Sequence, residues 1–141
     1  MRKIVLDTSV VVAGLRSMTG AGNAVLRLVA QQELVLLATP ALFLEYEEVL
    51  KRAEQRLAHG LSLKEIDSFL RALASACEPV EIHFQWRPQL SDADDEIVLE
   101  TAVNGRADAL VTHNVRDFRS AAEKFGLRVL IPGELLMERR S

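Results

Sequence analysis

Short apolar runs recur along the chain, and segments with a helical pattern separate each run from the next. Each run has four or five residues, which is a normal length for a strand and too short for a helix. Strands that alternate with helices are typical of a parallel sheet covered on both faces. The sequence therefore predicts an α/β fold, with three α/β/α layers around a central parallel sheet. The predicted strands are residues 3–6, 34–38, 80–84, 109–112 and 128–131.

Capping residues mark several predicted helices. Thr39 is a favoured cap and a proline follows it, so a helix is predicted from Pro40 to about Ala58. Ser62-Leu63-Lys64-Glu65 has the pattern of a capping box and opens a helix that ends near Ala76. Further helices are predicted over residues 10–15 and 24–31, from the cap Ser91 to Asn104, up to Phe125, and from Pro132.

Composition limits the class of protein. The chain has 141 residues, 49% of them hydrophobic, and this size predicts one domain over residues 1–141. The net charge of −3 gives no general attraction to phosphate or to anionic membranes, so nucleic acid has to be bound by local features. Cys77 is the single cysteine of the sequence, which excludes an intramolecular disulfide and a cysteine-rich metal site. Without an apolar stretch of membrane-spanning length, a soluble cytoplasmic protein is expected.

A polar segment interrupts the apolar run of the first predicted strand. Asp7-Thr8-Ser9 follows Leu6 directly, and a carboxylate at the edge of a core needs a partner. All three residue types also favour the N-cap of a helix, so capping stays open as their role. The carboxyl ends of parallel strands are, however, where α/β proteins bind ligands. His113-Asn114 follows the predicted strand 109–112 at the same edge.

Two further acidic residues are candidates for the same site because of their positions on the predicted helices. Glu45 lies at the edge of an apolar stripe, three residues after Leu42. Asp95 shares a helical face with Val98 and so points towards the sheet. Its neighbours Asp94 and Glu96 are predicted to point elsewhere.

The candidate acidic residues come from separate elements and can converge beyond the strand ends. Two carboxylates about 4 Å apart repel each other by roughly 4 kcal/mol at an effective dielectric constant of 20. A shared proton or a cation relieves such repulsion, and an all-oxygen donor set suits Mg²⁺ or Mn²⁺. The matching chemistry is attack of metal-activated water on a phosphodiester. The candidate residues are Asp7, Glu45, Asp95, Asn114 and Asp117.

In their order and spacing, four segments resemble the PIN-domain family, and more narrowly its small VapC-like toxins of toxin–antitoxin pairs. The segments are Asp7-Thr8-Ser9, residues 44–50 (LEYEEVL), residues 94–102 (DDEIVLETA) and residues 107–114 (ADALVTHN). The resemblance covers nearly the whole chain. It implies a Mg²⁺- or Mn²⁺-dependent endoribonuclease, a hydrolase of single-stranded RNA, which has an antitoxin as its partner and forms a homodimer.

The resemblance also assigns roles to residues. It implies that three acids are the catalytic metal ligands: Asp7, Glu45 and Asp95. It implies that three hydroxyls order ligands and waters: Thr8, Ser9 and Thr112. Where the family often has a fourth acid this chain has Asn114, with Asp117 three residues later. Which of these two completes the site stays open.

Some residues outside the acidic group are candidates for contact with RNA. Arg16 and Arg116 lie in segments expected at the rim of the site and are predicted to bind RNA phosphates. Trp86 lies in a loop, where we expect it to pack on the sheet edge rather than to stack on a base.

Two other functions are compatible with parts of the pattern. One is a PIN-like domain that binds RNA or protein with little or no cleavage. The other is an α/β phosphatase of the haloacid-dehalogenase type, whose first strand also ends in Asp. Such phosphatases carry a second Asp two residues later, where this chain has Ser9, and this difference counts against them. The chain contains no GxxxxGK[ST] motif, which excludes a P-loop nucleotide-binding site.

Overall fold

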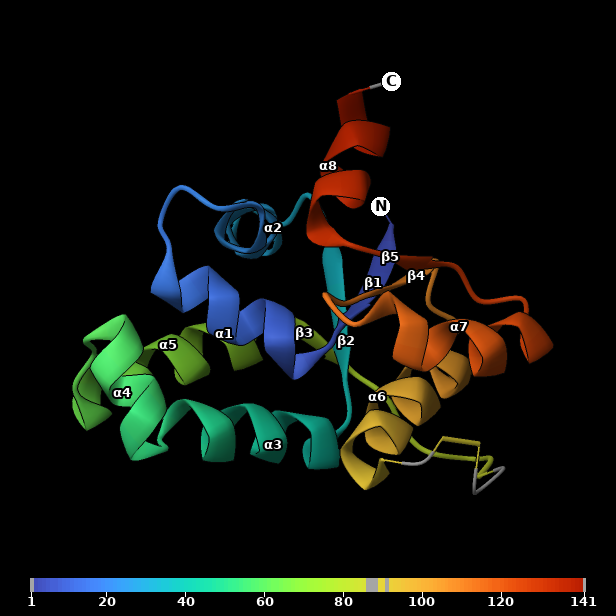
Figure 1. Cartoon of the computed structure of the whole chain (residues 1–141), viewed down its shortest axis with the longest axis horizontal. Coiled ribbons are helices and arrows are strands. Elements are labelled where there is room, and N and C mark those ends of the chain that lie inside the picture. Colours follow the sequence, from blue (N-terminus) through green and yellow to red (C-terminus); the bar gives the residue numbers. More distant parts are fainter. Residues whose placement is uncertain (1, 86–88, 91, 141) are drawn as a thin grey trace.

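A parallel sheet lies at the centre of the molecule (Figure 1). The computed structural model describes residues 2–85, 89–90 and 92–140. In this part of the chain five strands pair in the order β3-β2-β1-β4-β5, and every neighbouring pair is parallel. The predicted α/β fold with a parallel sheet is therefore confirmed. The strands are β1 (Lys3–Leu6), β2 (Val35–Ala38), β3 (Cys77–Pro79), β4 (Ala109–Val111) and β5 (Val129–Leu130).

Helices cover both faces of the sheet (Figure 1). Right-handed crossovers place the helices that follow β1 and β2 on one face and those that follow β3 and β4 on the other. The first group is α1 (Thr8–Arg16), α2 (Ala21–Ala30), α3 (Pro40–Leu50), α4 (Ala53–His59) and α5 (Leu63–Ala76). The second group is α6 (Ala93–Asn104) and α7 (Val115–Lys124), and the last helix, α8 (Pro132–Arg140), packs against α2 and β5.

The central strand is apolar because helices cover it on both sides. Ile4, Val5 and Leu6 of β1 are each 0% exposed, as are Leu110 and Val111 of the neighbouring β4. A strand buried on both faces needs a continuous apolar run rather than an alternating one. The short apolar runs of the sequence therefore form the central layer of the hydrophobic core.

The sheet has a topological switch point between β1 and β4. The chain leaves β1 towards one face and leaves β4 towards the other, and open α/β sheets bind ligands beyond the carboxyl ends of the strands at such a point. We refer to the region beyond these two strand ends as the crevice. The backbone N–H of Asp7 donates to the Val111 carbonyl at 2.9 Å and continues the β1–β4 pairing to this edge. The residues after both strands therefore border one crevice.

The helix predicted from Pro40 to Ala58 is wrong as one helix. α3 ends at Leu50, and α4 begins after Arg52, whose backbone is extended. The chain turns there because tertiary contacts hold the break. The His59 ring hydrogen-bonds the Leu50 carbonyl at 3.1 Å, and the Lys51 ammonium group lies 2.7 Å from the Asp67 carboxylate of α5. Leu57, predicted to lie in the apolar stripe, is 88% exposed.

The strand predicted over residues 80–84 is also wrong. The strand at this edge of the sheet is β3, which starts directly after α5 and contains Pro79, a residue that an edge strand tolerates. Beyond it the chain leaves the sheet because Asn104 of α6 holds it. The Asn104 side-chain carbonyl accepts the backbone N–H groups of His83 at 2.8 Å and of Phe84 at 2.9 Å.

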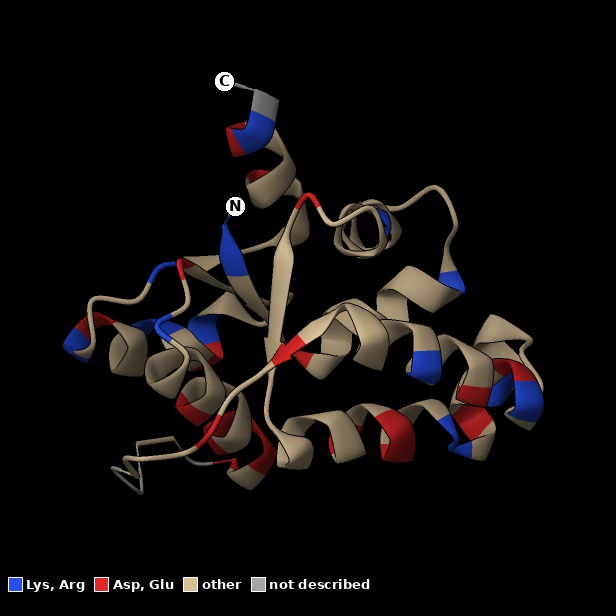
Figure 2. Cartoon of the chain, turned by 180° about the vertical axis from the view of Figure 1, so that it is seen from behind, with Lys and Arg blue, Asp and Glu red and all other residues tan. Residues whose placement is uncertain are grey.

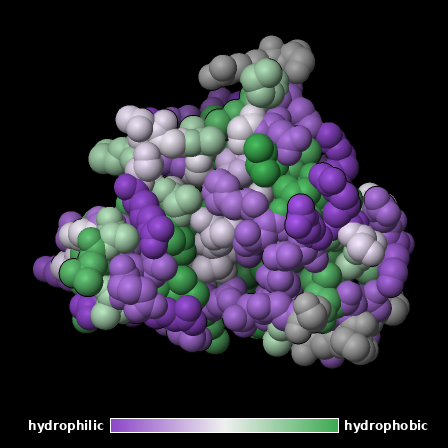
Figure 3. Space-filling model, viewed as in Figure 1, coloured by the Kyte–Doolittle hydropathy of each residue, from purple (hydrophilic) through white to green (hydrophobic). Residues whose placement is uncertain are grey.

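The predicted cap Ser91 and the loop residue Trp86 lie outside the described residues. α6 is capped by Asp92, whose carboxylate accepts the Asp94 backbone N–H at 2.8 Å. None of the helices in the described part of the chain combines the length and the apolar character needed to cross a membrane. On the face that Figure 3 shows, hydrophobic side chains reach the surface at several separate places, as is normal for a folded protein.

The crossing of α1 and α2 requires a glycine, and this gives a prediction for stability. A Cβ at Gly22 would lie 3.0 Å from the Val10 carbonyl oxygen and 3.2 Å from the Gly14 nitrogen, both of them backbone atoms of α1. We expect Gly22→Ala to lower the free energy of unfolding by about 1–2 kcal/mol, although alanine favours helix. Urea denaturation measures the change. Gly133→Ala in α8 is the control, because a Cβ there meets nothing within 4 Å. A change of equal size in both variants would contradict the packing argument.

Candidate active site

Two hydroxyl groups, one in the first turn of α1 and one just after β4, orient the Asp7 carboxylate. Asp7 follows β1 and is 6% exposed. Its Oδ2 accepts hydrogen bonds from Ser9 Oγ at 2.8 Å and from Thr112 Oγ1 at 2.7 Å. Asp7 occupies the N-cap position of α1, yet its side chain makes no capping hydrogen bond. The Asp7 carboxylate therefore does not act as the helix cap, because it is bonded to the Ser9 and Thr112 hydroxyls and not to a backbone N–H of α1.

The segment after β4 is tied to the same carboxylate. Thr112 is 0% exposed, and its hydroxyl oxygen accepts the Asn114 backbone N–H at 2.9 Å while its proton goes to Asp7. The His113 backbone N–H donates to Ser9 Oγ at 3.3 Å. The loops after β1 and β4 are therefore joined through side chains that hold Asp7 in place.

α3 brings Glu45 to the same crevice. The next residue, Tyr46, is 0% exposed and donates its hydroxyl proton to the Leu6 carbonyl at the end of β1. This contact fixes the rotation of α3, so that Glu45 is directed at the first turn of α1. There the Thr8 hydroxyl donates to Glu45 Oε2. Thr8 itself is buried.

α6 contributes two acids rather than one. Asp95 is half-buried, as its helical phase predicts, and lies close enough to Asp7 for their charges to interact. Asp94 was predicted to point elsewhere, but its carboxyl group lies within hydrogen-bonding and charge range of Glu45. Glu96 does point away: it is 5% exposed and accepts the Leu90 backbone N–H at 2.6 Å. The helical phase missed Asp94 because α6 is contacted by α3 as well as by the sheet.

Burial and mutual repulsion raise the pKa of two of these carboxyls. Burial raises the pKa of Glu45 to about 7; the hydrogen bond from Thr8 acts in the opposite direction, and Asp94 and Asp7 add to the increase. Burial also raises the pKa of Asp95 to about 6, and the nearby acids add to the increase. Those acids are Asp7, Asp92, Asp117 and Asp94.

No basic side chain among the described residues neutralises the negative charge of these carboxylates. The ion pairs of residues 2–85, 89–90 and 92–140 include none to these acids. Figure 2 shows acidic residues along α3 and α6, and neither helix contains Lys or Arg. The acids concerned are Asp7, Glu45, Asp94, Asp95 and Asp117.

The chemistry of this donor set fits a hydrated divalent cation. Its side chains supply only oxygen, and their net negative charge has no ion-pair partner among the residues that the structure describes, which suits Mg²⁺ or Mn²⁺. Within the described part of the chain, no three His, Cys, Asp or Glu side chains converge closely enough to enclose an ion by themselves. Mg²⁺ normally binds through one or two carboxylates and keeps several waters. The arrangement therefore suits an ion held partly through water and not a closed protein cage.

The remaining candidates lie at the rim or away from it. Asn114 and Asp117 are exposed at the start of α7. The Asn114 side chain does not cap the helix. The charge of Asp117 contributes to the raised pKa of Asp95. Arg116 is exposed between them. Arg16 is not brought to the acids: it lies at the far end of α1, where its guanidinium donates to the Gln55 side chain at 2.7 Å.

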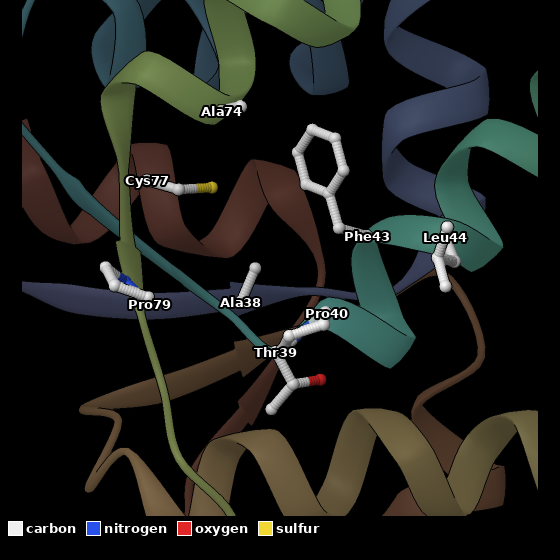
Figure 4. A pocket seen from close by; sticks show the side chains of 8 residues that line it. All are labelled: Ala38, Thr39, Pro40, Phe43, Leu44, Ala74, Cys77 and Pro79. Carbon is white, nitrogen blue, oxygen red and sulfur yellow. The ribbon is translucent and has the colours of Figure 1, made fainter.

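An apolar pocket of about 470 Å³ lies between α3, α5 and β3 (Figure 4). The Cys77 sulfur and the Phe43 ring point into the same space, and burial raises the pKa of the Cys77 thiol to about 11. The thiol is therefore protonated at neutral pH and is a poor nucleophile. The pocket has no acidic lining residue and so lacks the oxygen donor set found beyond β1 and β4. Its lining is Ala38, Thr39, Pro40, Phe43, Leu44, Ala74, Cys77 and Pro79.

Comparison with known proteins gives a family and a fold. The PIN-domain family matches residues 3–116. This chain is similar, with a TM-score of 0.60, to a chain in a crystal structure from Rickettsia felis. That structure is of VapBC2 bound to a DNA fragment from their promoter. The two share 14% sequence identity over 91% of this chain and 96% of the other, so this likeness concerns the fold alone. No curated protein matches the chain significantly.

The raised pKa of Asp95 gives a pH-dependent prediction. A carboxyl whose pKa is raised by folding favours the folded state at low pH, and this contribution is lost as the pH rises from about 4 to about 6. Without divalent ions, we therefore expect Asp95→Asn to raise the free energy of unfolding at pH 8. The expected gain is about 1 kcal/mol, reduced from the full shift because the side chain is partly exposed. Urea denaturation in EDTA at several pH values measures it.

The exposed acid Glu54 of α4 provides the matched control. Glu54→Gln removes the same charge far from the crevice, and its effect should stay within about 0.5 kcal/mol at every pH. A gain for Asp95→Asn that is as large at pH 4 as at pH 8 would show that the buried negative charge of Asp95 is not its cause.

Proposed function

The chain belongs to the PIN-domain family, and we propose that it is a metal-dependent endoribonuclease that hydrolyses phosphodiester bonds of single-stranded RNA. The observation that carries this proposal is the group of carboxylates beyond β1 and β4. They come from separate elements, two of them have raised pKa values, and no described basic side chain neutralises them. Such a site favours a divalent cation over a structural ion pair.

We assign the binding of the ion to Asp7, Glu45 and Asp95. Bound there, Mg²⁺ or Mn²⁺ would lower the pKa of a water molecule and neutralise charge on the scissile phosphate. The hydroxyls that already bond to these carboxylates keep them oriented for this purpose: Ser9 and Thr112 on Asp7, and Thr8 on Glu45. Such outer partners of metal ligands typically affect metal affinity by 10–100-fold.

The rim of the crevice supplies the remaining roles. Asp117 adds negative charge near Asp95 and is the better candidate for the fourth acid, while Asn114 offers an amide oxygen at the start of α7. Arg116, exposed on the same turn, is proposed to contact an RNA phosphate. Arg16 loses this role, because it lies at the opposite end of α1.

RNA cleavage tests the proposal directly. We expect the protein to cut a fluorescent single-stranded RNA in Mn²⁺ or Mg²⁺ and not in EDTA, with gel analysis of the products. Asp7→Asn, Glu45→Gln and Asp95→Asn should each reduce the rate by at least about 100-fold, because a bound metal supplies several kcal/mol to the reaction.

The control for this assay is Glu54→Gln, which should cleave like the wild type, and thermal melting should show that all variants are folded. Cleavage that persists in EDTA or in Asp7→Asn would refute the mechanism. RNA that is bound in a gel-shift assay but never cut, with any of the ions, would support the alternative of a binding domain without activity.

The biological part of the proposal is that the protein is the toxin of a toxin–antitoxin pair, with a small antitoxin protein as its partner. Its support is the likeness in fold to a chain of a VapBC2 structure. Induced expression in a bacterial host should arrest growth, and Asp7→Asn should restore it, with the culture density as the readout. Equal growth of both strains at equal protein levels would contradict the toxin role. The homodimer implied by the family stays a prediction, which sedimentation can measure.

A further inference from the structure

A buried pair of hydroxyl groups links α3 to α6. Thr39 lies at the N-cap of α3 and is 2% exposed, and Thr101 of α6 is 0% exposed. Their Oγ1 atoms are 3.0 Å apart, although the residues are 62 positions apart in the chain. The two helices carry the acids of the crevice, Glu45 on α3 and Asp95 on α6.

The direction of this hydrogen bond follows from the other bonds of the two hydroxyls. Thr101 donates its proton to the Ile97 carbonyl at 2.8 Å. Thr39 Oγ1 accepts the Leu42 backbone N–H at 3.2 Å as the helix cap. The Thr39 proton is thus left for Thr101 Oγ1, and both groups are satisfied. Each hydroxyl has one defined partner for its proton, so the bridge fixes one separation between the helices.

A hydroxyl pair is not needed for burial alone. The Thr39 hydroxyl also caps α3, but at Thr101 a valine would fill a similar volume without a polar atom, and a buried hydroxyl is costly once its partner is lost. What the bridge adds is a direction and a distance between two helices that otherwise meet through side chains of the crevice. Tyr46 fixes α3 against β1, and the Thr39–Thr101 bridge fixes the start of α3 against α6.

We propose that Thr39 and Thr101 are positioning residues of the site, whose bridge sets the spacing of Glu45 from Asp94 and Asp95 and thereby the affinity for the divalent ion. This inference rests on the proposed function. The repelling acids of α3 and α6 push the two helices apart, and the bridge opposes this movement when no ion is bound. Loss of the bridge lets the acids separate, so that an ion has to draw the helices together as it binds.

The test compares Thr101→Ala with Thr101→Ser. Both remove the same methyl group, and only serine keeps the hydroxyl. Isothermal titration with Mn²⁺ on the full chain measures binding without any RNA. We expect Thr101→Ala to weaken Mn²⁺ binding by about 10-fold and Thr101→Ser to stay within about 3-fold of the wild type. In RNA cleavage, the Mn²⁺ concentration at half-maximal rate should rise in the same proportion, with the KM for RNA unchanged.

A destabilised variant far from the site separates positioning from general loss of stability. Leu73→Ala in the core face of α5 should lower the melting temperature and leave the Mn²⁺ affinity of the folded protein unchanged. If Thr101→Ala does not fold, Thr101→Val takes its place, since it keeps the side-chain volume. Equal Mn²⁺ affinity in the wild type and the variant without the hydroxyl would overturn the inference and leave the proposed function intact. A wild type that binds no Mn²⁺ and cuts no RNA would overturn both.

Discussion

The carboxylate of Asp7, held by one hydroxyl from α1 and one from the residue that follows β4, makes the contacts on which the site depends. Ser9 and Thr112 both donate to its Oδ2, and the Asp7 backbone N–H extends the pairing of the two strands. The parallel sheet reverses its winding at this place, so the two loops would diverge without such contacts. The bond to Thr112 therefore joins the loops and orients the acid at the same time.

The same acids weaken the fold that presents them. Glu45 and Asp95 are partly removed from water beside other carboxylates, and their raised pKa values show that the charged forms are disfavoured. The apolar strands β1 and β4 and the helices around them supply the stability that tolerates this arrangement. Under the proposed function, a cation bound by these acids would relieve this cost and couple metal binding to folding.

The fold could be predicted because its central strands are short, apolar and buried on both faces. Such strands can be recognised from a few consecutive residues. The break between α3 and α4 could not, because no glycine or proline marks it: His59 and Lys51 hold it through contacts with residues distant in the chain. Strand β3 was missed for a similar reason. Pro79 resembles a helix stop, and only the position of β2 beside it shows that it ends a strand.

The candidate site could be predicted to the extent that one helix face decides where an acid points. The helical phase of Asp95 with the core residues of α6 identifies it, but Asp94 lies near Glu45 because α3 packs against α6. That packing depends on Tyr46, which reaches the Leu6 carbonyl, and on Thr39, which reaches Thr101. Neither residue carries a charge or belongs to a motif of acids, so a search for metal ligands passes over both. The acids supply the chemistry of the site, while neutral buried hydroxyls decide how far apart they are.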